Sequence, residues 1–332
     1  MSERFLIVRL GSLGDVIHGV PVVGALRQRF PDASIEWAVD RRYVELLALV
    51  RGLDRTIAVD TRGALSRLAA TIADLRRGDY ACAFDLQGLL KSAVLARLAG
   101  ARKTVGFTRA HLRERAAALF YSDAIEPRGA HVIEKNLSLL AVVGIERPAV
   151  SFPIDVPRTT ASDAVTTRFP DGYAVVNPGA AWPNKRWPPE RFGAVAQALR
   201  ERIAVPSIVL WGPGEERLAT AVVDASRGAA QLSPPTTIVD LFAIARGARL
   251  IVSGDTGPLH VAAAVGTPVV ALFGPTRAER NGPWSPDDVS ISRTHMCACI
   301  YERRCRRQVP CIDDISVADV VRAIEQRVSA HG

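Results

Sequence analysis

Residues 249–273 constrain the fold more than any other stretch of the 332-residue chain. A short apolar run at 249–252 is followed by the turn Ser-Gly-Asp-Thr-Gly-Pro-Leu-His at 253–260, a small-residue helical pattern and a second apolar run at 269–273. This order predicts a strand, a tight turn, a helix and a strand, the unit of a parallel sheet. Backbone N–H groups at the helix start would hold a phosphate, and Asp255 beside them would bind sugar hydroxyls.

The same alternation of apolar runs and helical patterns occurs in both halves of the chain, and it predicts an α/β fold with two parallel sheets. In the first half we expect strands at residues 5–10, 34–39, 56–59, 80–85 and 104–107, and helices at 16–30, 65–77, 89–98 and 130–143. In the second half we expect strands at 173–177, 207–211, 249–252 and 269–273, and helices at 189–203, 238–246 and 317–328. Residues 148–170 carry four prolines and little periodicity, which is typical of a linker.

Composition narrows the class of protein. The chain is 48% hydrophobic and 23% charged, as expected for a globular protein with a full core. No apolar run is long enough to span a bilayer, and the N-terminal run is interrupted by Arg9, so we expect no signal peptide and a cytosolic location. The net charge of +8 favours a polyanionic partner, although a high-GC genome that favours arginine would give the same total.

Four polar turns follow predicted strands, where ligands of α/β folds bind. In the first turn, residues 11–15, Asp15 stands at a helix start, where it is either a cap or a general base. The turn lacks the G-x-G-x-x-G pattern, which disfavours a dinucleotide site. In the loop at 177–188, Lys185 would neutralise a leaving diphosphate or would be a solvated cation.

The remaining two turns carry weaker signals. Glu215 follows a glycine turn, where it would hold ribose hydroxyls or match the helix dipole. His260 would bond a phosphate or pack at its helix start. Diphosphate, ribose and sugar contacts thus all fall on the second half and the candidate base on the first, a division that suits transfer from a nucleotide sugar to an acceptor.

Five cysteines are present, and four of them lie within fifteen residues near the end of the chain. Cys82 belongs to an apolar run and is expected in the core. In a reducing cytosol the late cluster favours a metal over disulfides, but its C-x-C-x5-C-x5-C spacing differs from the usual paired C-x2-C. A metal and unpaired structural or redox thiols therefore remain equal alternatives for Cys297, Cys299, Cys305 and Cys311.

Several segments resemble one known family. Residues 7–18, Ile-Val-Arg-Leu-Gly-Ser-Leu-Gly-Asp-Val-Ile-His, are similar to the N-terminal motif of the ADP-heptose:lipopolysaccharide heptosyltransferases. The Lys-Arg-Trp-Pro sequence at 185–188, the Trp-Gly turn at 211–212 and Asp-Thr-Gly-Pro-Leu-His at 255–260 are similar to the second half of that family. Residues 85–93 and 119–121 most resemble its heptosyltransferase I members.

This resemblance implies a GT-B fold, with two Rossmann-like domains facing each other across a cleft. Residues 1–158 would bind the acceptor, residues 159–314 would bind the nucleotide sugar, and the helix at 315–332 would return to the first domain. It implies an inverting glycosyltransferase that moves L-glycero-D-manno-heptose from ADP-heptose to the Kdo of Kdo2-lipid A. The resemblance also implies that this transfer requires no cofactor or metal.

The resemblance also implies roles for individual residues. Asp15 would take the proton of the acceptor hydroxyl, Lys185 would stabilise the leaving ADP, and Asp255 would bind heptose. Ala180 and Ala181 stand where hydroxyl residues are common, so backbone N–H groups would replace a side-chain contact there. The full donor set is Ala180, Ala181, Lys185, Glu215, Asp255, Thr256, Gly257, Pro258 and His260, and the acceptor set is Gly14, Arg62, Lys91, Arg109 and Arg113.

The expected partners are ADP-heptose and Kdo2-lipid A, with peripheral contact to the cytoplasmic face of the inner membrane and no nucleic acid. The nearest alternative is heptosyltransferase II or another family member with a different acceptor or sugar. A nicotinamide-binding oxidoreductase and a non-catalytic binding module are more distant alternatives.

Overall fold

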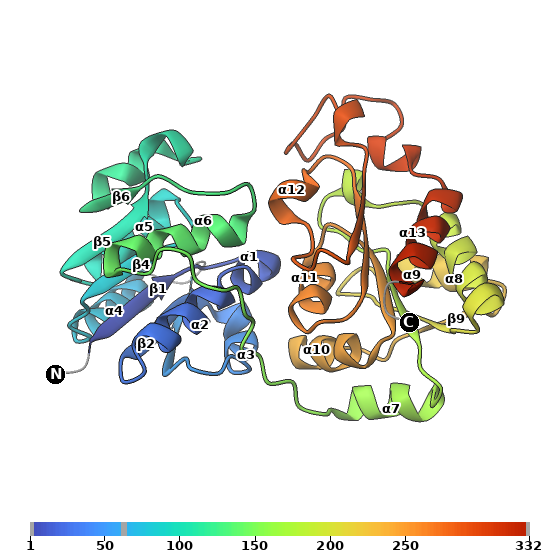
Figure 1. Cartoon of the computed structure of the whole chain (residues 1–332), viewed down its shortest axis with the longest axis horizontal. Helices are drawn as coiled ribbons and strands as arrows, with labels where there is room; N and C mark the ends of the chain where they lie inside the picture. Colours follow the sequence, from blue (N-terminus) through green and yellow to red (C-terminus); the bar gives the residue numbers. More distant parts are fainter. Residues whose placement is uncertain (1–2, 61–64, 330–332) are drawn as a thin grey trace. The chain divides into compact units, whose positions relative to one another are not determined.

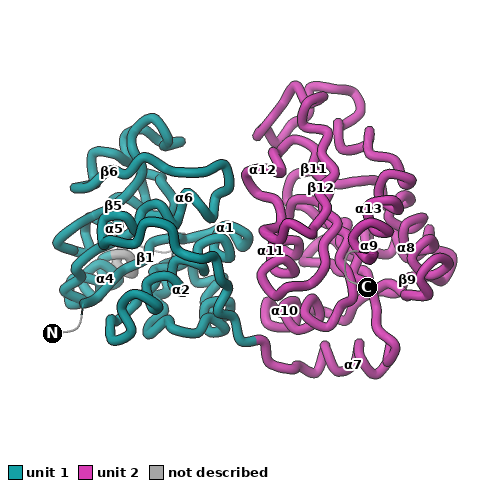
Figure 2. The backbone as a smooth tube through the Cα atoms, in the orientation of Figure 1, with its two compact units in different colours: residues 1–155 teal, residues 156–332 magenta. Residues whose placement is uncertain are grey.

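The computed structural model describes residues 3–60 and 65–329, and its contacts divide the chain into two compact units, Met1–Asp155 and Val156–Gly332 (Figure 2). Each unit contains a six-stranded parallel sheet, in the orders β3-β2-β1-β4-β5-β6 and β12-β11-β10-β7-β8-β9. When the strands are counted within each unit, both orders are the doubly wound 3-2-1-4-5-6 arrangement. The two α/β halves expected from the sequence are therefore confirmed.

The first unit places a helix or turn after most of its strands (Figure 1). Its strands are β1 (Arg4–Val8), β2 (Ser34–Asp40), β3 (Arg55–Val59), β4 (Cys82–Asp85), β5 (Lys103–Phe107) and β6 (Asp123–Ile125). Its α-helices are α1 (Leu13–Ile17), α2 (Val20–Arg29), α3 (Val44–Leu47), α4 (Leu65–Arg76), α5 (Leu90–Leu98) and α6 (Val132–Ser138).

The second unit repeats this plan (Figure 1). Its strands are β7 (Ala174–Asn177), β8 (Ser207–Val209), β9 (Ala230–Leu232), β10 (Leu250–Gly254), β11 (Val269–Phe273) and β12 (Val289–Ser292). Its α-helices are α7 (Thr160–Arg168), α8 (Pro189–Ile203), α9 (Glu216–Ala225), α10 (Ile238–Gly247), α11 (Gly257–Ala264), α12 (Ala278–Asn281) and α13 (Val317–Ser329). None of the helices within the described residues is both long and apolar enough to cross a membrane.

The central strands form the cores because helices cover them on both faces, which explains their continuous apolar sequences. In β1, Phe5, Leu6, Ile7 and Val8 are all fully buried, and β10 and β11 are buried throughout. A rigid sheet of this kind fixes the ends of its strands, so the turns that follow β1, β7, β8 and β10 are held in defined positions.

Some predicted elements differ from the structure. The helix expected at 16–30 is two helices separated at Gly19, where a Cβ would lie 2.7 Å from the Trp37 ring. The expected linker at 148–170 contains α7, which begins at a reciprocal cap between Thr159 and Ser162. The strands β6, β9 and β12 were not expected because each is a short edge strand with few buried residues.

The last helix requires a correction. The resemblance implied that residues 315–332 return to the first domain, but α13 packs against α8, β11 and β12 of the second unit. Val320, Ala323 and Ile324 lie on one face of the helix and belong to the apolar core of that unit. The division of the chain at Asp155/Val156 lies three residues before the expected boundary at 158/159.

Candidate functional site

The turn after β1 presents the Asp15 carboxylate. Asp15 is the third residue of α1, and its Oδ2 accepts hydrogen bonds from the Ser12 backbone N and Oγ, both at 3.0 Å. Its Oδ1 lies 2.5 Å from Nη2 of Arg9, and 34% of the Asp15 side chain is exposed. The carboxylate therefore serves as a reciprocal helix cap and is also accessible to water, so the two readings of this residue are compatible.

The turn packs closely against its neighbours. A Cβ at Gly11 would lie 2.8 Å from Cε2 of Tyr43, so only glycine allows this approach. Tyr43 ends the 3-10 helix Arg41–Tyr43, and burial raises the pKa of its hydroxyl. Tyr43 is therefore a neutral neighbour of Asp15 at physiological pH.

Asp85 organises the neighbouring turn after β4. It is fully buried and accepts hydrogen bonds from the backbone N of Gln87 at 2.9 Å, Oγ of Ser92 at 3.0 Å and the hydroxyl of Tyr121 at 2.8 Å. Burial raises the pKa of Asp85, and these hydrogen bonds oppose that rise. Asp85 was assigned no role of its own from the sequence, although a carboxylate that ends an apolar run and precedes a glycine turn is a recognisable signal.

The candidate acceptor residues are spread over the first unit. Gly14 is buried in α1, whereas Lys91, Arg109 and Arg113 are exposed cations. Lys91 and Arg113 belong to segments that are joined by a hydrogen bond from the Leu90 backbone N to the Glu114 carboxylate at 2.7 Å. Arg62 lies outside the described residues. Lys91 and Arg113 are therefore exposed cations on two neighbouring segments of the first unit.

The turn after β10 holds Asp255 in a closed cluster. One Asp255 oxygen, Oδ2, lies 2.6 Å from Nζ of Lys185 and accepts a 2.6 Å hydrogen bond from Oγ1 of Thr276. The other oxygen lies 3.3 Å from Nε2 of His260. Burial raises the pKa of this carboxyl, but His260 and Lys185 outweigh burial and hold the pKa well below its usual range. Asp255 is therefore a buried permanent anion.

Lys185 is held by the loop after β7. Its Nζ lies 4.8 Å from the centre of the Trp182 ring, and its side chain is 15% exposed. The neighbouring Asn184 is buried and donates a hydrogen bond to the Glu302 carbonyl at 2.9 Å. The loop also contains Ala180, which is buried, and Ala181, which is exposed. Lys185 is thus a positioned cation and not a freely solvated one.

Asn177 links the β7 and β10 turns. Its Nδ2 donates to Oγ of Ser253 and to Oγ1 of Thr256, both at 2.9 Å. Thr256 is the N-cap of α11, which begins with Gly257 and Pro258. The start of α11, where backbone N–H groups have no partner within the helix, therefore lies beside the Asp255 cluster.

Glu215 completes the set from a third strand. Its Oε2 accepts a hydrogen bond from the Gly212 backbone N at 3.1 Å, and a Cβ at Gly179 would lie only 2.2 Å from this oxygen. The β7 loop and the β8 turn therefore meet at the Glu215 carboxylate. The strands β10, β7 and β8 are neighbours in the parallel sheet. The predicted donor residues in the three turns that follow them therefore lie together at the carboxyl ends of these strands.

The four late cysteines also lie together. Sγ of Cys299 is 3.6 Å from Sγ of both Cys297 and Cys305, and all five cysteines of the chain are free. Burial and the neighbouring thiols raise the pKa of Cys311 to about 12. Within residues 3–60 and 65–329, no group of three or more His, Cys, Asp or Glu side chains is arranged to hold a metal. Cys82 is buried in the core as expected.

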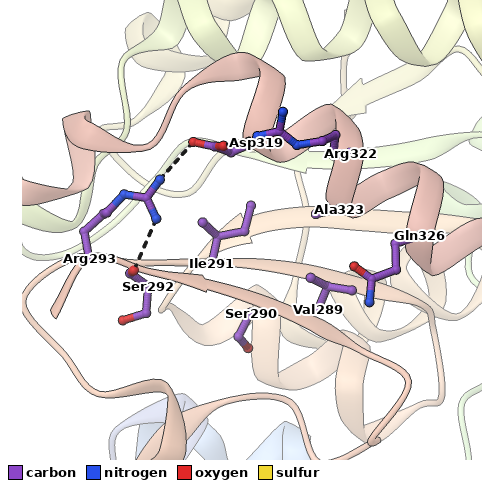
Figure 3. A pocket seen from close by; sticks show the side chains of 9 residues that line it. All are labelled: Val289, Ser290, Ile291, Ser292, Arg293, Asp319, Arg322, Ala323 and Gln326. Atoms are coloured by element: carbon purple, nitrogen blue, oxygen red, sulfur yellow. Dashed lines mark hydrogen bonds and ion pairs between the residues drawn. The ribbon is translucent and has the colours of Figure 1, made fainter. Parts of the chain in front are cut away.

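A separate cavity of about 400 Å³ lies between β12 and α13 (Figure 3). Arg293 and Asp319 line it and form an ion pair at 2.9 Å across one end. None of the predicted site residues lines this cavity, so it is distinct from the candidate site.

The sequence is similar to those of known glycosyltransferases. The model of glycosyltransferase family 9 (heptosyltransferase) matches residues 68–309. The chain is 29% identical to lipopolysaccharide heptosyltransferase 1 of Pseudomonas aeruginosa, over 96% of this chain and 92% of that protein. It is 25% identical to lipopolysaccharide heptosyltransferase 3 of Escherichia coli K12, over 94% of each chain.

A solved structure supports the fold. The structure of E. coli heptosyltransferase WaaC with ADP matches with a TM-score of 0.74 and 24% identity, covering 98% of each chain. The two doubly wound units therefore form a GT-B fold of the heptosyltransferase type. The family match covers well over half of the sequence, and the chain belongs to glycosyltransferase family 9, the heptosyltransferase family.

Proposed function

We propose that the protein transfers heptose from ADP-heptose to the Kdo of Kdo2-lipid A, with inversion at the anomeric carbon. The observation that carries the proposal is the donor set built by three adjacent turns of the second unit: the Asp255–Lys185 cluster, the start of α11 and Glu215. The relative from P. aeruginosa is named a heptosyltransferase 1, and the WaaC structure contains ADP.

Different residues of the donor set would bind the diphosphate, the ribose and the heptose of ADP-heptose. The start of α11 at Thr256 and Gly257 offers backbone N–H groups to the diphosphate. Glu215 would accept hydrogen bonds from ribose hydroxyls. Asp255 would bind heptose hydroxyls through its carboxylate, and Lys185 beside it would neutralise the negative charge that builds on the departing ADP.

The proton transfer would belong to Asp15. Its carboxylate takes the proton of the acceptor hydroxyl, while that oxygen forms a bond to the anomeric carbon and the bond from this carbon to the ADP oxygen breaks. ADP leaves with the bonding electrons, so charge and atoms balance without a metal or another cofactor. Asp255 is unsuited to this role because its side chain is only 4% exposed and because its lowered pKa makes the carboxylate a weak base.

Opposite charge would bring the acceptor to the first unit. Kdo2-lipid A is anionic, and the chain carries a net charge of +8, with Lys91, Arg109 and Arg113 exposed on the first unit. These residues would hold the acceptor at the cytoplasmic face of the inner membrane, where the protein would act as a peripheral enzyme. Arg62 is a further candidate for the same contact.

A second candidate function is the addition of a later heptose, because a heptosyltransferase 3 is also a close relative. The test is ADP release by the purified protein with ADP-heptose and either deacylated Kdo2-lipid A or the same acceptor already carrying one heptose. The proposal expects turnover with the first acceptor and at least a tenfold lower kcat/KM with the second. The reverse preference would assign the later step, and no ADP release with either acceptor would refute both.

A further inference from the structure

Arg9 is a buried cation at the end of β1 that the assigned roles leave unused. The residue is 6% exposed. Its Nη1 donates to the Leu86 carbonyl, and its Nη2 lies 2.5 Å from Oδ1 of Asp15. Its Nε is buried and has no hydrogen-bond partner among the residues that the structure describes. A charge is costly in such a place unless it is paired, and here its partner is the carboxylate proposed as the base.

The backbone around Arg9 is fixed from two sides. The Arg9 carbonyl accepts a hydrogen bond from Nε1 of Trp37 on β2 at 3.2 Å. The Leu10 backbone N donates to Oε1 of Gln87, in the turn after β4, at 2.9 Å. The guanidinium is therefore presented by a rigid frame, and it holds one Asp15 oxygen while Ser12 holds the other.

We propose that Arg9 is a positioning residue, which fixes the orientation of the Asp15 carboxylate that accepts the proton. The inference rests on the proposed function, in which Asp15 takes the proton of the acceptor. The Asp15 side chain is 34% exposed, so an acceptor hydroxyl can reach the carboxylate while Arg9 and Ser12 hold it.

Other charged groups near this turn act on different partners or stay neutral. Tyr43, from the 3-10 helix beside the turn, is kept protonated by burial. On β2, Asp40 is paired with Arg42 at 2.9 Å. On β4, Asp85 is bonded to Ser92 and Tyr121. Removal of Arg9, which contacts the carboxylate itself, should therefore act directly on the titration of Asp15.

The test is the pH dependence of kcat and kcat/KM for Arg9→Gln, with acceptor and ADP-heptose varied separately. Loss of an adjacent cation should raise the pKa of Asp15, so the acidic limb of the profile should move to higher pH by about 1–2 units. Arg9→Lys should restore the limb because it restores the charge. Arg9→Lys should still lower kcat about tenfold at unchanged acceptor KM, because one ammonium group cannot reproduce the separate contacts of the guanidinium with the Leu86 carbonyl and with Asp15.

The matched control is Arg4→Gln. Arg4 lies at the opposite end of the same strand and is ion-paired with the buried carboxylate of Glu36, so its loss should leave the pH profile in place. A folded Arg9→Gln protein with an unshifted limb would overturn the inference, as would full kcat in Arg9→Lys. If Arg9→Gln does not fold, the kcat of Arg9→Lys decides.

The inference and the proposed function can fail separately. Full turnover by Asp15→Asn would refute the base assignment itself, whatever the Arg9 variants do. A large loss of turnover in Asp15→Asn, together with unshifted Arg9 profiles, would retain the base and reject only the role of Arg9.

Discussion

The turns after β1 and β10 are built from the same local pattern and hold their aspartates in opposite ways. In both, a buried strand ends in a glycine-containing turn that leads into a helix. The Asp15 side chain is 34% exposed and its carboxylate contacts Arg9 and Ser12. The Asp255 side chain is 4% exposed and is enclosed by Lys185, His260 and Thr276.

The chemical role of each carboxylate therefore depends on the residues that surround its turn and not on the turn itself. Lys185 comes from the loop after β7, and Thr276 follows β11, so the enclosure of Asp255 depends on contacts far apart in the sequence. A carboxylate with its oxygens engaged is suited to holding charge and hydroxyls in place. A carboxylate that water reaches is suited to receiving a proton.

The largest expected effect is on stability. Asp255→Ala would leave the Lys185 ammonium largely buried without its carboxylate, so the free energy of unfolding should fall by about 3–5 kcal/mol. Asp15→Ala would also remove the carboxylate partner of the buried Arg9, but Arg9 keeps its contact with the Leu86 carbonyl and water can enter the place of the partly exposed Asp15 side chain, so the loss should be smaller, about 1–3 kcal/mol. Urea denaturation followed by circular dichroism measures both, and equal losses would remove the contrast between the two turns.

The pH dependence of this loss sharpens the same contrast. The pKa of Asp255 is lowered in the folded protein, so its stabilising contribution is complete above the ordinary carboxyl pKa of about 3.9 and is lost as the pH falls below it. The difference in unfolding free energy between wild type and Asp255→Asn should therefore be larger at pH 6 than at pH 3. A difference that grows on acidification would contradict the lowered pKa.

A smaller effect is expected for donor binding at Glu215. Glu215→Gln keeps the shape but removes the charge from the proposed ribose contact, so the Kd for ADP-heptose should rise about fivefold to tenfold, roughly 1 kcal/mol. Gly179→Ala should give a similar rise because its Cβ would displace the carboxylate. The control is Glu216→Gln, the exposed next residue, with unchanged Kd by calorimetry; an equal rise in the control would show that Glu215 has no special contact.

Much of the fold could be predicted because the central strands are continuous apolar runs with helical patterns between them. Residues 189–203 and 269–273 match α8 and β11 residue for residue. The helix α7 was missed because prolines and polar residues mask its capping signal. The placement of α13 was wrong because the face that it buries does not say which unit it covers.

The sequence allowed individual site residues to be predicted, but not the contacts between them. Turns at strand ends singled out Asp15, Lys185, Glu215 and Asp255, since polar residues there have few structural reasons to occur together. The contacts that distinguish them were not predictable: Thr276 lies 21 residues beyond Asp255, and Leu86 lies 77 residues beyond Arg9. Such pairings depend on strand order, which the sequence pattern does not specify.

The central claim, that Asp15 moves the proton while Asp255 holds the donor, is tested most directly by one pair of variants. Turnover and ADP-heptose binding should be measured side by side for Asp15→Asn and Asp255→Asn. The account predicts that Asp15→Asn lowers kcat by about 10²–10⁴-fold with donor Kd within twofold of wild type, whereas Asp255→Asn weakens donor binding. Wild-type kcat in Asp15→Asn, or tight donor binding by Asp255→Asn, would contradict it.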